Sequence, residues 1–213
     1  MTAGGFQMLL DGAWTTIWIS LLAIVGGVPL GFVFSLIRVS RVPVLSQIVV
    51  VYVSLGRATP LVTLVIFLFV TLPVFGINID KYTAGVLALT LNTTSFNTEV
   101  WRSVYLAFPQ PQIEAARSMG MMRGLYFRRI MLPQMWYAAL PSLVNEMTFL
   151  IKASPAIAVI GVVDLTRVTN QIAAQTYEPL PPILVAGAMY ILFISILVRL
   201  QRRLEKRAER YAT

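Results

Sequence analysis

The chain has 213 residues, of which 57% are hydrophobic and only 12% are charged. A soluble domain usually has about a quarter of its residues charged, so this composition excludes an ordinary soluble protein and indicates an integral membrane protein. The sequence contains no cysteine and no histidine. Their absence excludes disulfides, thiolate nucleophiles, imidazole catalysis and most zinc sites. We therefore expect that the chain holds no metal site and catalyses no reaction itself.

Several stretches with few charges are long enough to cross a bilayer, which takes about 20 apolar residues in a helix. They cover residues 12–37, 58–79, 82–98, 130–151 and 179–198. The third stretch is short, and the fourth includes Glu146. The sequence therefore predicts an all-α integral membrane protein with about five transmembrane helices, folded as a single transmembrane domain over residues 1–213.

The basic residues predict the orientation, because cytoplasmic segments retain Lys and Arg. Most of the 17 cations follow the first, third and fifth expected spans: Arg38, Arg41, Arg102, Arg117, Arg123, Arg128, Arg129, Arg199, Arg202, Arg203, Lys206, Arg207 and Arg210. The N-terminus is therefore expected outside and the C-terminus inside. The basic tail, residues 199–213, directly follows a span, so we expect it to contact anionic lipid of the bilayer and no nucleic acid.

The segment 108–129 is long for a simple connection between two spans. Pro109 and Pro111 suit the start of a helix, and Glu114 falls in the first turn, where the helix dipole favours an acid. Ala115 and Ala116 have small side chains that would let another protein approach closely, and Gly120 is suited to end the helix. Taken alone, the segment could equally be an interfacial helix that only connects two spans.

The spacing of residues in this segment favours a helix that contacts another protein. Glu-Ala-Ala at residues 114–116, Gly120, and Ile-x-Leu-Pro at residues 130–133 resemble the cytoplasmic loop of the permease subunits of binding-protein-dependent ABC importers. Arg-Ala-Thr-Pro-Leu-Val at residues 57–62 and Thr-Glu-Val-Trp-Arg at residues 98–102 resemble motifs of the polar amino-acid permeases in that family. The chain departs from their pattern at Ala58, at Leu64 and in residues 153–156, where Asp or Asn followed by Thr-Ser-Leu is common.

The resemblance implies a function and a set of partners. The chain would be the pore subunit of an ATP-driven importer for a polar amino acid or a related small solute, working by alternating access in a bacterial cytoplasmic (inner) membrane. It would pair with a second permease chain, identical or similar, with an ATPase subunit dimer and with an extracytoplasmic solute-binding protein. The sequence has no P-loop, so ATP and Mg would be bound by the ATPase subunits, and the chain would carry no cofactor and not be an enzyme. Glu114, Ala115, Ala116 and Gly120 would form the coupling helix that contacts the ATPase.

Polar groups in the expected spans, at their edges or in the stretch before the fifth span are candidates for the solute pathway, because ionisable side chains are costly in a bilayer. We expect Glu99 and Asp164 to contact the solute most directly. The further candidates for the pathway are Arg57, Thr59, Pro60, Thr98 and Lys152. For Arg57 and Glu99 the alternative is snorkelling or a structural ion pair, and for Glu146 and Lys152 it is a structural pair within or between helices.

Two other classes of function stay open at this point. A self-contained secondary transporter or channel subunit would fit the spans, although we find no convincing internal repeat, and an odd number of spans does not divide into equal halves. An intramembrane enzyme without His or Cys would need a Ser–Lys or paired-carboxylate site, and only Glu146 with Lys152 approaches that requirement.

Overall fold

The computed structural model describes residues 3–40 and 42–212, and every regular element in these ranges is a helix. Arg41 and the side chain of Arg210, which contributed to the predicted charge bias, lie outside what is described. The expected all-α fold is confirmed. The elements are α1 (Ala3–Ser40), α2 (Pro43–Ala58), α3 (Leu61–Val74), α4 (Lys81–Leu106), α5 (Gln110–Ser118), α6 (Arg123–Tyr126), the π-helix η1 (Phe127–Met131), α7 (Leu132–Ala153), the 3-10 helix η2 (Ser154–Ile160), α8 (Leu165–Thr176) and α9 (Leu180–Ala212).

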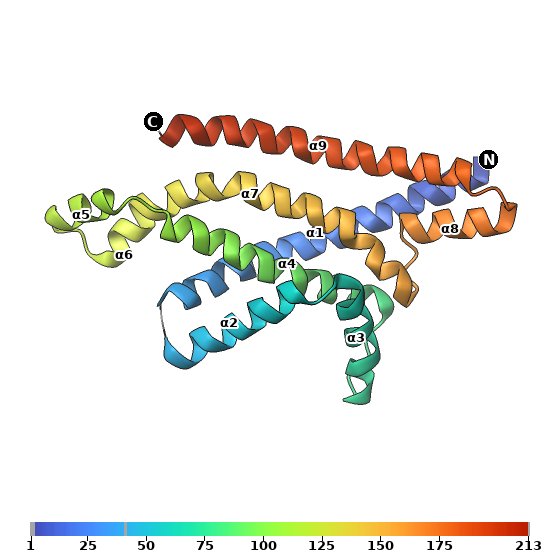
Figure 1. Cartoon of the computed structure of the whole chain (residues 1–213), viewed down its shortest axis with the longest axis horizontal. Coiled ribbons are helices and arrows are strands. Elements are labelled where there is room, and N and C mark those ends of the chain that lie inside the picture. Colours follow the sequence, from blue (N-terminus) through green and yellow to red (C-terminus); the bar gives the residue numbers. More distant parts are fainter. Residues whose placement is uncertain (1–2, 41, 213) are drawn as a thin grey trace.

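Helix α4 lies at the centre of the molecule and contacts α1, α2, α3 and α7, while α9 packs on α7 (Figure 1). The C-terminal ends of α1, α4 and α9 lie at the same end of the molecule as α5 and α6. The N-terminus and α8 lie at the opposite end. The segments that hold most of the basic residues are thus gathered at one end, as the charge pattern requires.

The largest contact between helices joins α1 and α4, and it depends on glycines spaced four residues apart. A Cβ atom added at Gly27 would overlap the Cγ2 atom of Thr93, and one added at Gly31 would lie 2.8 Å from the Cβ atom of Asn97. Small residues at this spacing let two helix backbones approach closely, which is how helices pack where no hydrophobic effect drives them together. The pair Gly27 and Gly31 therefore sets the separation of α1 and α4.

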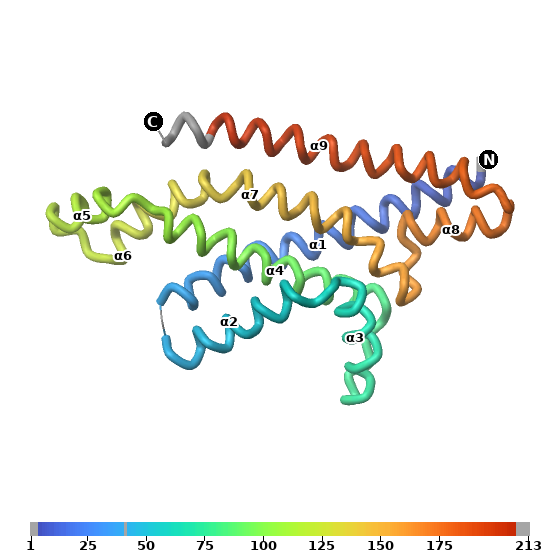
Figure 2. The backbone as a smooth tube through the Cα atoms, viewed as in Figure 1, coloured from blue at the N-terminus to red at the C-terminus, as the bar shows by residue number. Residues whose placement is uncertain are grey.

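The expected span at residues 58–79 is interrupted near its start. Helix α2 ends at Ala58, the chain is extended at Thr59 and Pro60, and α3 leaves at 113° to α2 (Figure 2). Pro60 has no N–H group and favours an extended conformation at the residue before it, so a continuous helix is excluded here. The helical segment before the break, α2, was not among the predicted spans.

Three of the described helical segments are long and apolar enough to cross a membrane: Gly4–Ser40, Arg123–Ile160 and Leu180–Arg207. The bent pair α2 and α3 makes a fourth candidate if it is counted as one span. Helix α4, expected as a span, does not pass this test because its middle is polar. Thr93, Thr94, Ser95, Asn97 and Thr98 of α4 are buried against neighbouring helices rather than facing lipid.

Candidate functional site

A cavity of about 390 Å³ lies where the break between α2 and α3 faces α4 and α7. Its walls mix polar and apolar side chains: Thr59, Leu61, Asn92, Thr93, Phe96, Glu146, Phe149, Leu150 and Ala153. The volume is in the range of pockets that bind small molecules. Backbone freed by a broken helix can be exposed at membrane depth only where it lines such a cavity.

Two charged groups of opposite sign belong to this cavity. Glu146 of α7 lies in its wall and is partly buried. The guanidinium carbon of Arg57 lies 5.6 Å from the centre of the Phe96 ring, which is also in the wall, and Arg57 interacts electrostatically with Glu146. The two side chains come from α7 and from the end of α2. The cavity therefore offers a carboxylate and a guanidinium to one small molecule.

Of the pathway residues predicted from the sequence, Thr59 lines the cavity, and Arg57 and Lys152 reach aromatic rings that line it. The Lys152 ammonium lies 5.5 Å from the centre of the Phe149 ring. Pro60 supplies the helix break as the residue before α3. Thr98 is fully buried, its hydroxyl donating to the Thr94 carbonyl at 2.7 Å, and it does not contribute to the cavity wall.

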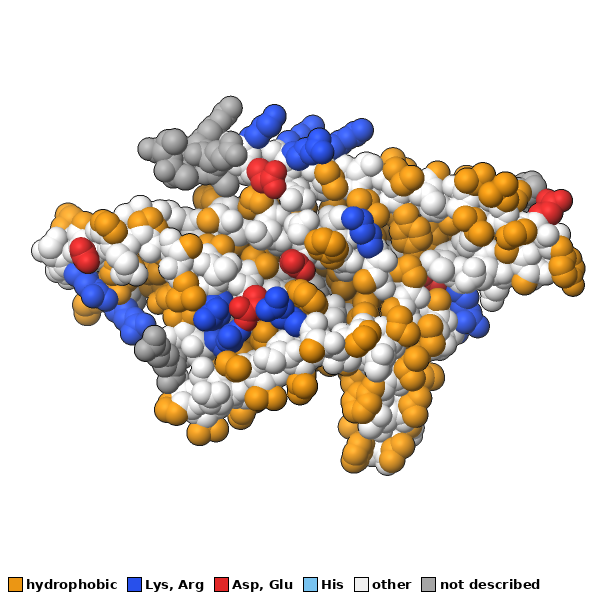
Figure 3. Space-filling model, viewed as in Figure 1, with side chains coloured by type: hydrophobic (Ala, Val, Ile, Leu, Met, Phe, Trp, Pro, Cys, Tyr) orange, Lys and Arg blue, Asp and Glu red, His pale blue; other side chains and the backbone are white. Residues whose placement is uncertain are grey.

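Glu99, expected to contact the solute, is engaged by two arginines instead. Arg38 of α1 forms an ion pair with one carboxylate oxygen, and Arg102 Nη1 lies 3.5 Å from the other. Figure 3 shows acidic and basic side chains side by side in the middle of this face, among hydrophobic side chains. The placement of Glu99 fits a structural ion pair between α1 and α4 and does not bring it into the cavity wall.

Asp164 has a structural contact of a different kind. It precedes α8, where its Oδ1 atom accepts a hydrogen bond of 2.9 Å from the Arg167 amide. Its side chain is fully buried, and the next amide, that of Leu165, donates to the Thr16 hydroxyl of α1 at 3.1 Å. Asp164 therefore caps α8 and helps to fix α8 against α1, away from the cavity.

Sequence reasoning missed Asn92, Thr93, Phe96 and Glu146 as wall residues. Glu146 was interpreted as one half of a pair with Lys152. Residues six apart on a helix lie about 120° from each other around its axis, since each residue turns about 100°, so this spacing argues against such a pair. The polar run of α4 was the other available signal, because polar side chains inside a membrane protein face its interior.

The predicted coupling segment is a helix, α5, which ends in a left-handed glycine. Gly120 has φ +76°, its amide donates to the Arg117 carbonyl at 2.9 Å, and the Met121 amide donates to the Ala116 carbonyl at 3.0 Å. These two bonds are the Schellman arrangement that satisfies the last carbonyls of a helix. The role of Gly120 as the helix terminator, read from the sequence, agrees with this geometry.

The small side chains of α5 do not share one environment. Glu114 and Ala115 are exposed, whereas Ala116 is 4% exposed and packs with Phe108, Tyr126, Met131 and Met135. Ala116 therefore packs against the rest of this chain, whereas the exposed face of α5 includes Glu114 and Ala115.

Two side-chain contacts hold α5 in place. Arg117 donates to the Tyr126 hydroxyl at 3.4 Å, and this hydrogen bond raises the pKa of Arg117. Gln134 at the start of α7 donates to the Gln112 side chain at 2.9 Å. Movement of α5 would therefore be transmitted to α6 and to α7, the helix that carries Glu146.

Comparison with known proteins decides which family this fold represents. Residues 27–210 match the family described as the binding-protein-dependent transport system inner membrane component. The chain belongs to this family. The family indicated by the loop and by residues 57–62 and 98–102 is thereby confirmed, and the chain is a permease subunit.

Curated relatives cover nearly the full length of the permease. It is 33% identical over 200 residues to the arginine transport system permease protein ArtQ of Bacillus subtilis, covering 93% of the permease and 91% of the relative. It is 31% identical over 207 residues to the L-cystine transport system permease protein TcyB of Bacillus subtilis, with coverages of 97% and 88%. It is 30% identical over 202 residues to the glutamine transport system permease protein GlnP of Escherichia coli, with coverages of 94% and 92%.

Solved structures agree with this assignment. A chain from an amino acid ABC transporter crystallised with histidines superposes with a TM-score of 0.89 at 31% identity, covering 95% of the permease and 94% of that chain. A chain of the inward-facing methionine transporter MetNI superposes with a TM-score of 0.75 at 19% identity, covering 96% and 99%. The second likeness supports the fold alone.

Proposed function

We propose that the permease is the pore subunit of an ATP-driven amino-acid importer in a bacterial inner membrane, and that the cavity between α2, α3, α4 and α7 is its solute site. The observation that carries the proposal is the pair of opposite charges at one small cavity, Glu146 in the wall and Arg57 beside it. A free amino acid carries an ammonium and a carboxylate on one carbon. Its ammonium would bind Glu146 and its carboxylate would bind Arg57.

The rest of the cavity wall suggests which side chain the solute carries. Glu146 is the one carboxylate in the described wall, and it is engaged by the α-ammonium group, so a cationic side chain would find no second acid. Asn92, Thr59 and Thr93 supply an amide and hydroxyls, and Phe96, Phe149 and Leu150 supply apolar surface. This set fits a neutral polar amino acid better than arginine or lysine.

The relatives belong to transport systems that are named for arginine, glutamine and cystine. Amino acids are therefore the expected solutes. ATP and Mg would be held by an ATPase subunit dimer, a second permease chain would complete the pore, and an extracytoplasmic binding protein would deliver the solute. The exposed face of α5, with Glu114 and Ala115, would contact the ATPase. The alternative of a self-contained transporter or channel requires no such partner.

Uptake by the assembled transporter tests the solute site. The substitution Glu146→Gln preserves the size of the side chain and removes its charge. We expect uptake of a neutral amino acid to fall about ten- to hundredfold, because a charge-assisted contact contributes about 1.5–3 kcal/mol. The matched control is Glu178→Gln, an exposed acid after α8, which should leave uptake unchanged. Unchanged uptake in Glu146→Gln would exclude this cavity as the solute site.

Cross-linking tests the coupling assignment separately. The permease has no native cysteine, so a single cysteine reports one position. A cysteine at Ala115, which is exposed, should cross-link to the ATPase subunit, whereas one at the buried Ala116 should react poorly. Full reactivity of Ala115→Cys toward water-soluble reagents in the assembled complex, with no cross-link to the ATPase, would show that α5 is not the contact.

A further inference from the structure

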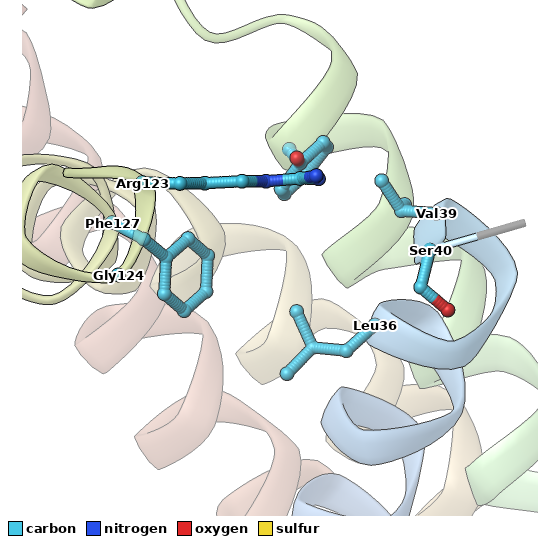
Figure 4. Close-up of a pocket in the computed structure, with 7 residues that line it drawn as sticks. Leu36, Val39, Ser40, Arg123, Gly124 and Phe127 are labelled. Carbon is cyan, nitrogen blue, oxygen red and sulfur yellow. The ribbon is translucent and has the colours of Figure 1, made fainter.

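A second cavity, of about 360 Å³, lies at the end of the molecule that carries α5 and α6. It is formed by the ends of α1 and α4 and by the segment after α5, through Leu36, Val39, Ser40, Tyr105, Arg123, Gly124 and Phe127. Figure 4 shows the Phe127 ring and Leu36 facing each other, while the Arg123 side chain extends from α6 toward the end of α1. The cavity is open to the surface.

Two hydrogen-bond donors at this cavity are free. Within the residues that the structure describes, neither the Arg123 guanidinium nor the Tyr105 hydroxyl has a hydrogen-bond or ion-pair partner. Other arginines nearby are engaged, since Arg38 and Arg102 pair with Glu99. The described lining contains no Asp or Glu, so the cavity presents one uncompensated positive charge and attracts an anion.

The remaining lining is apolar and favours an anion that carries a hydrocarbon chain. Leu36, Val39 and Phe127 supply apolar walls next to the charged group. Inorganic phosphate or a free nucleotide would satisfy Arg123 and leave these walls exposed to water, whereas an acyl chain would cover them. The Ser40 hydroxyl already donates to the Ile37 carbonyl at 2.8 Å, so recognition rests on Arg123 and Tyr105.

The position of the cavity identifies the source of such an anion. It lies at the end of the molecule where the basic segments gather, which the positive-inside rule places at the cytoplasmic leaflet. Basic pockets between helices on this side are suited to anionic headgroups. We propose that this cavity binds one anionic phospholipid of the cytoplasmic leaflet, with its phosphate on Arg123 and Tyr105 and the first part of an acyl chain between Leu36, Val39 and Phe127.

A lipid in this position has a structural consequence. Its phosphate would contact α6 and α4 while its acyl chain contacts α1, so it would bridge segments that otherwise meet across an open cavity. Helix α6 is joined to α5 through the Arg117–Tyr126 hydrogen bond. Lipid binding would therefore support the position of α5 independently of any solute in the cavity at α7.

Native mass spectrometry of the detergent-purified transporter complex tests this site. The complex is incubated with phosphatidylglycerol or with phosphatidylcholine of the same acyl chains, and the retained lipid is counted. We expect preferential retention of phosphatidylglycerol, reduced about fivefold in Arg123→Gln, the loss expected for one basic residue near an anionic surface. The matched control is Arg128→Gln, an exposed arginine five residues further along the chain, which should retain the lipid like the unmodified protein.

A second variant fills the cavity without changing charge. A Cβ added at Gly124 meets nothing within 4 Å, so Gly124→Leu should fold and occupy the space of the acyl chain. Its control is Gly4→Leu, where an added Cβ also meets nothing within 4 Å, at the other end of the molecule. Loss of phosphatidylglycerol in Gly124→Leu and Arg123→Gln, with retention in both controls, supports the proposal.

Three outcomes would overturn it. Equal loss in Arg123→Gln and Arg128→Gln would reduce the effect to general surface charge. Displacement of the lipid by millimolar inorganic phosphate would indicate a site for a free anion. Absence of retained phosphatidylglycerol from the complex with its ATPase would indicate that a protein partner covers the cavity. Each of these results leaves the solute site at Glu146 untouched, since that site is measured by uptake.

Discussion

Arg38 near the end of α1 forms an ion pair with Glu99 of α4, and the two side chains are only 15% and 24% exposed. A second carboxylate oxygen of Glu99 lies 3.5 Å from Nη1 of Arg102. The positive charges of Arg102 and Arg57 repel that of Arg38. One carboxylate thus pairs with two guanidinium groups, one from α1 and one from α4. Glu99 is the counter-charge that allows these arginines to lie close together.

The first prediction concerns this pair. Glu99→Gln leaves Arg38 and Arg102 without their anion, so we expect the complex to lose about 1–3 kcal/mol of stability, measured as a lower Tm. Adding Arg38→Met to Glu99→Gln should cost less than the sum of the two single changes, because the pair is already broken. Residual uptake should keep its preference among amino acids. A selective loss of uptake of one amino acid at an unchanged Tm would instead show that Glu99 contacts the solute.

Local signals in the sequence predicted the existence and the end of helix α5, although Glu114 lies beyond its first turn, because the helix begins at Gln110. Pro109 and Pro111, the alanines and Gly120 specify its start, its body and its end within a few residues of one another, so no distant contact is needed to define α5. The structure adds what such signals cannot contain. The environment of Ala116 depends on Tyr126, Met131 and Met135, which reach it only after the chain has folded back.

The proposed solute cavity was harder to predict because its wall residues come from three helices, α3, α4 and α7, and from the break between α2 and α3. Glu99 directly follows one expected span and Glu146 lies in another, and the sequence alone does not say which of these carboxylates meets an arginine across a helix contact. Tertiary packing decides this: Arg38 of α1 reaches Glu99, and the break at Thr59 and Pro60 opens space beside Glu146. Helix α2 was missed because the uncharged stretch that contains most of it, residues 42–56 between Arg41 and Arg57, is shorter than the roughly 20 residues that a span requires.

A second prediction follows from Ala153, which lines the cavity that we propose as the solute site. Ala153→Asp adds a second carboxylate to a wall that already contains Glu146. We expect the ratio of arginine uptake to glutamine uptake to rise about tenfold, the effect of one charge-assisted contact. Competition uptake assays measure this ratio. Ala153→Asn is the uncharged control, and an equal shift in both variants would rule out a charge effect.

A third prediction tests the contact between α1 and α4. Gly27→Ala places a methyl group on the Cγ2 atom of Thr93, so the helices must separate or Thr93 must move, at a cost of about 1–3 kcal/mol. The control is Gly187→Ala in α9, where an added Cβ meets nothing within 4 Å and the gain in helix propensity should slightly stabilise the protein. Thermal unfolding in detergent compares the two. Equal Tm values would show that α1 and α4 do not need this close approach.

The last prediction separates the shape of the α5 cap from the bulk of its residue. Gly120 has φ +76°, and an added Cβ meets nothing within 4 Å, so a substitution there is opposed by backbone conformation and not by crowding. A β-branched residue is strained in this region, and Gly120→Val should cost roughly 1–2 kcal/mol at the end of α5. Asn tolerates the left-handed conformation, so Gly120→Asn serves as the matched control. If the cap fixes α5 against the ATPase, Gly120→Val should leave the complex assembled while solute-stimulated ATP hydrolysis falls, and Gly120→Asn should retain most of it. Equal stimulation in the two variants would show that the left-handed cap is not needed for coupling.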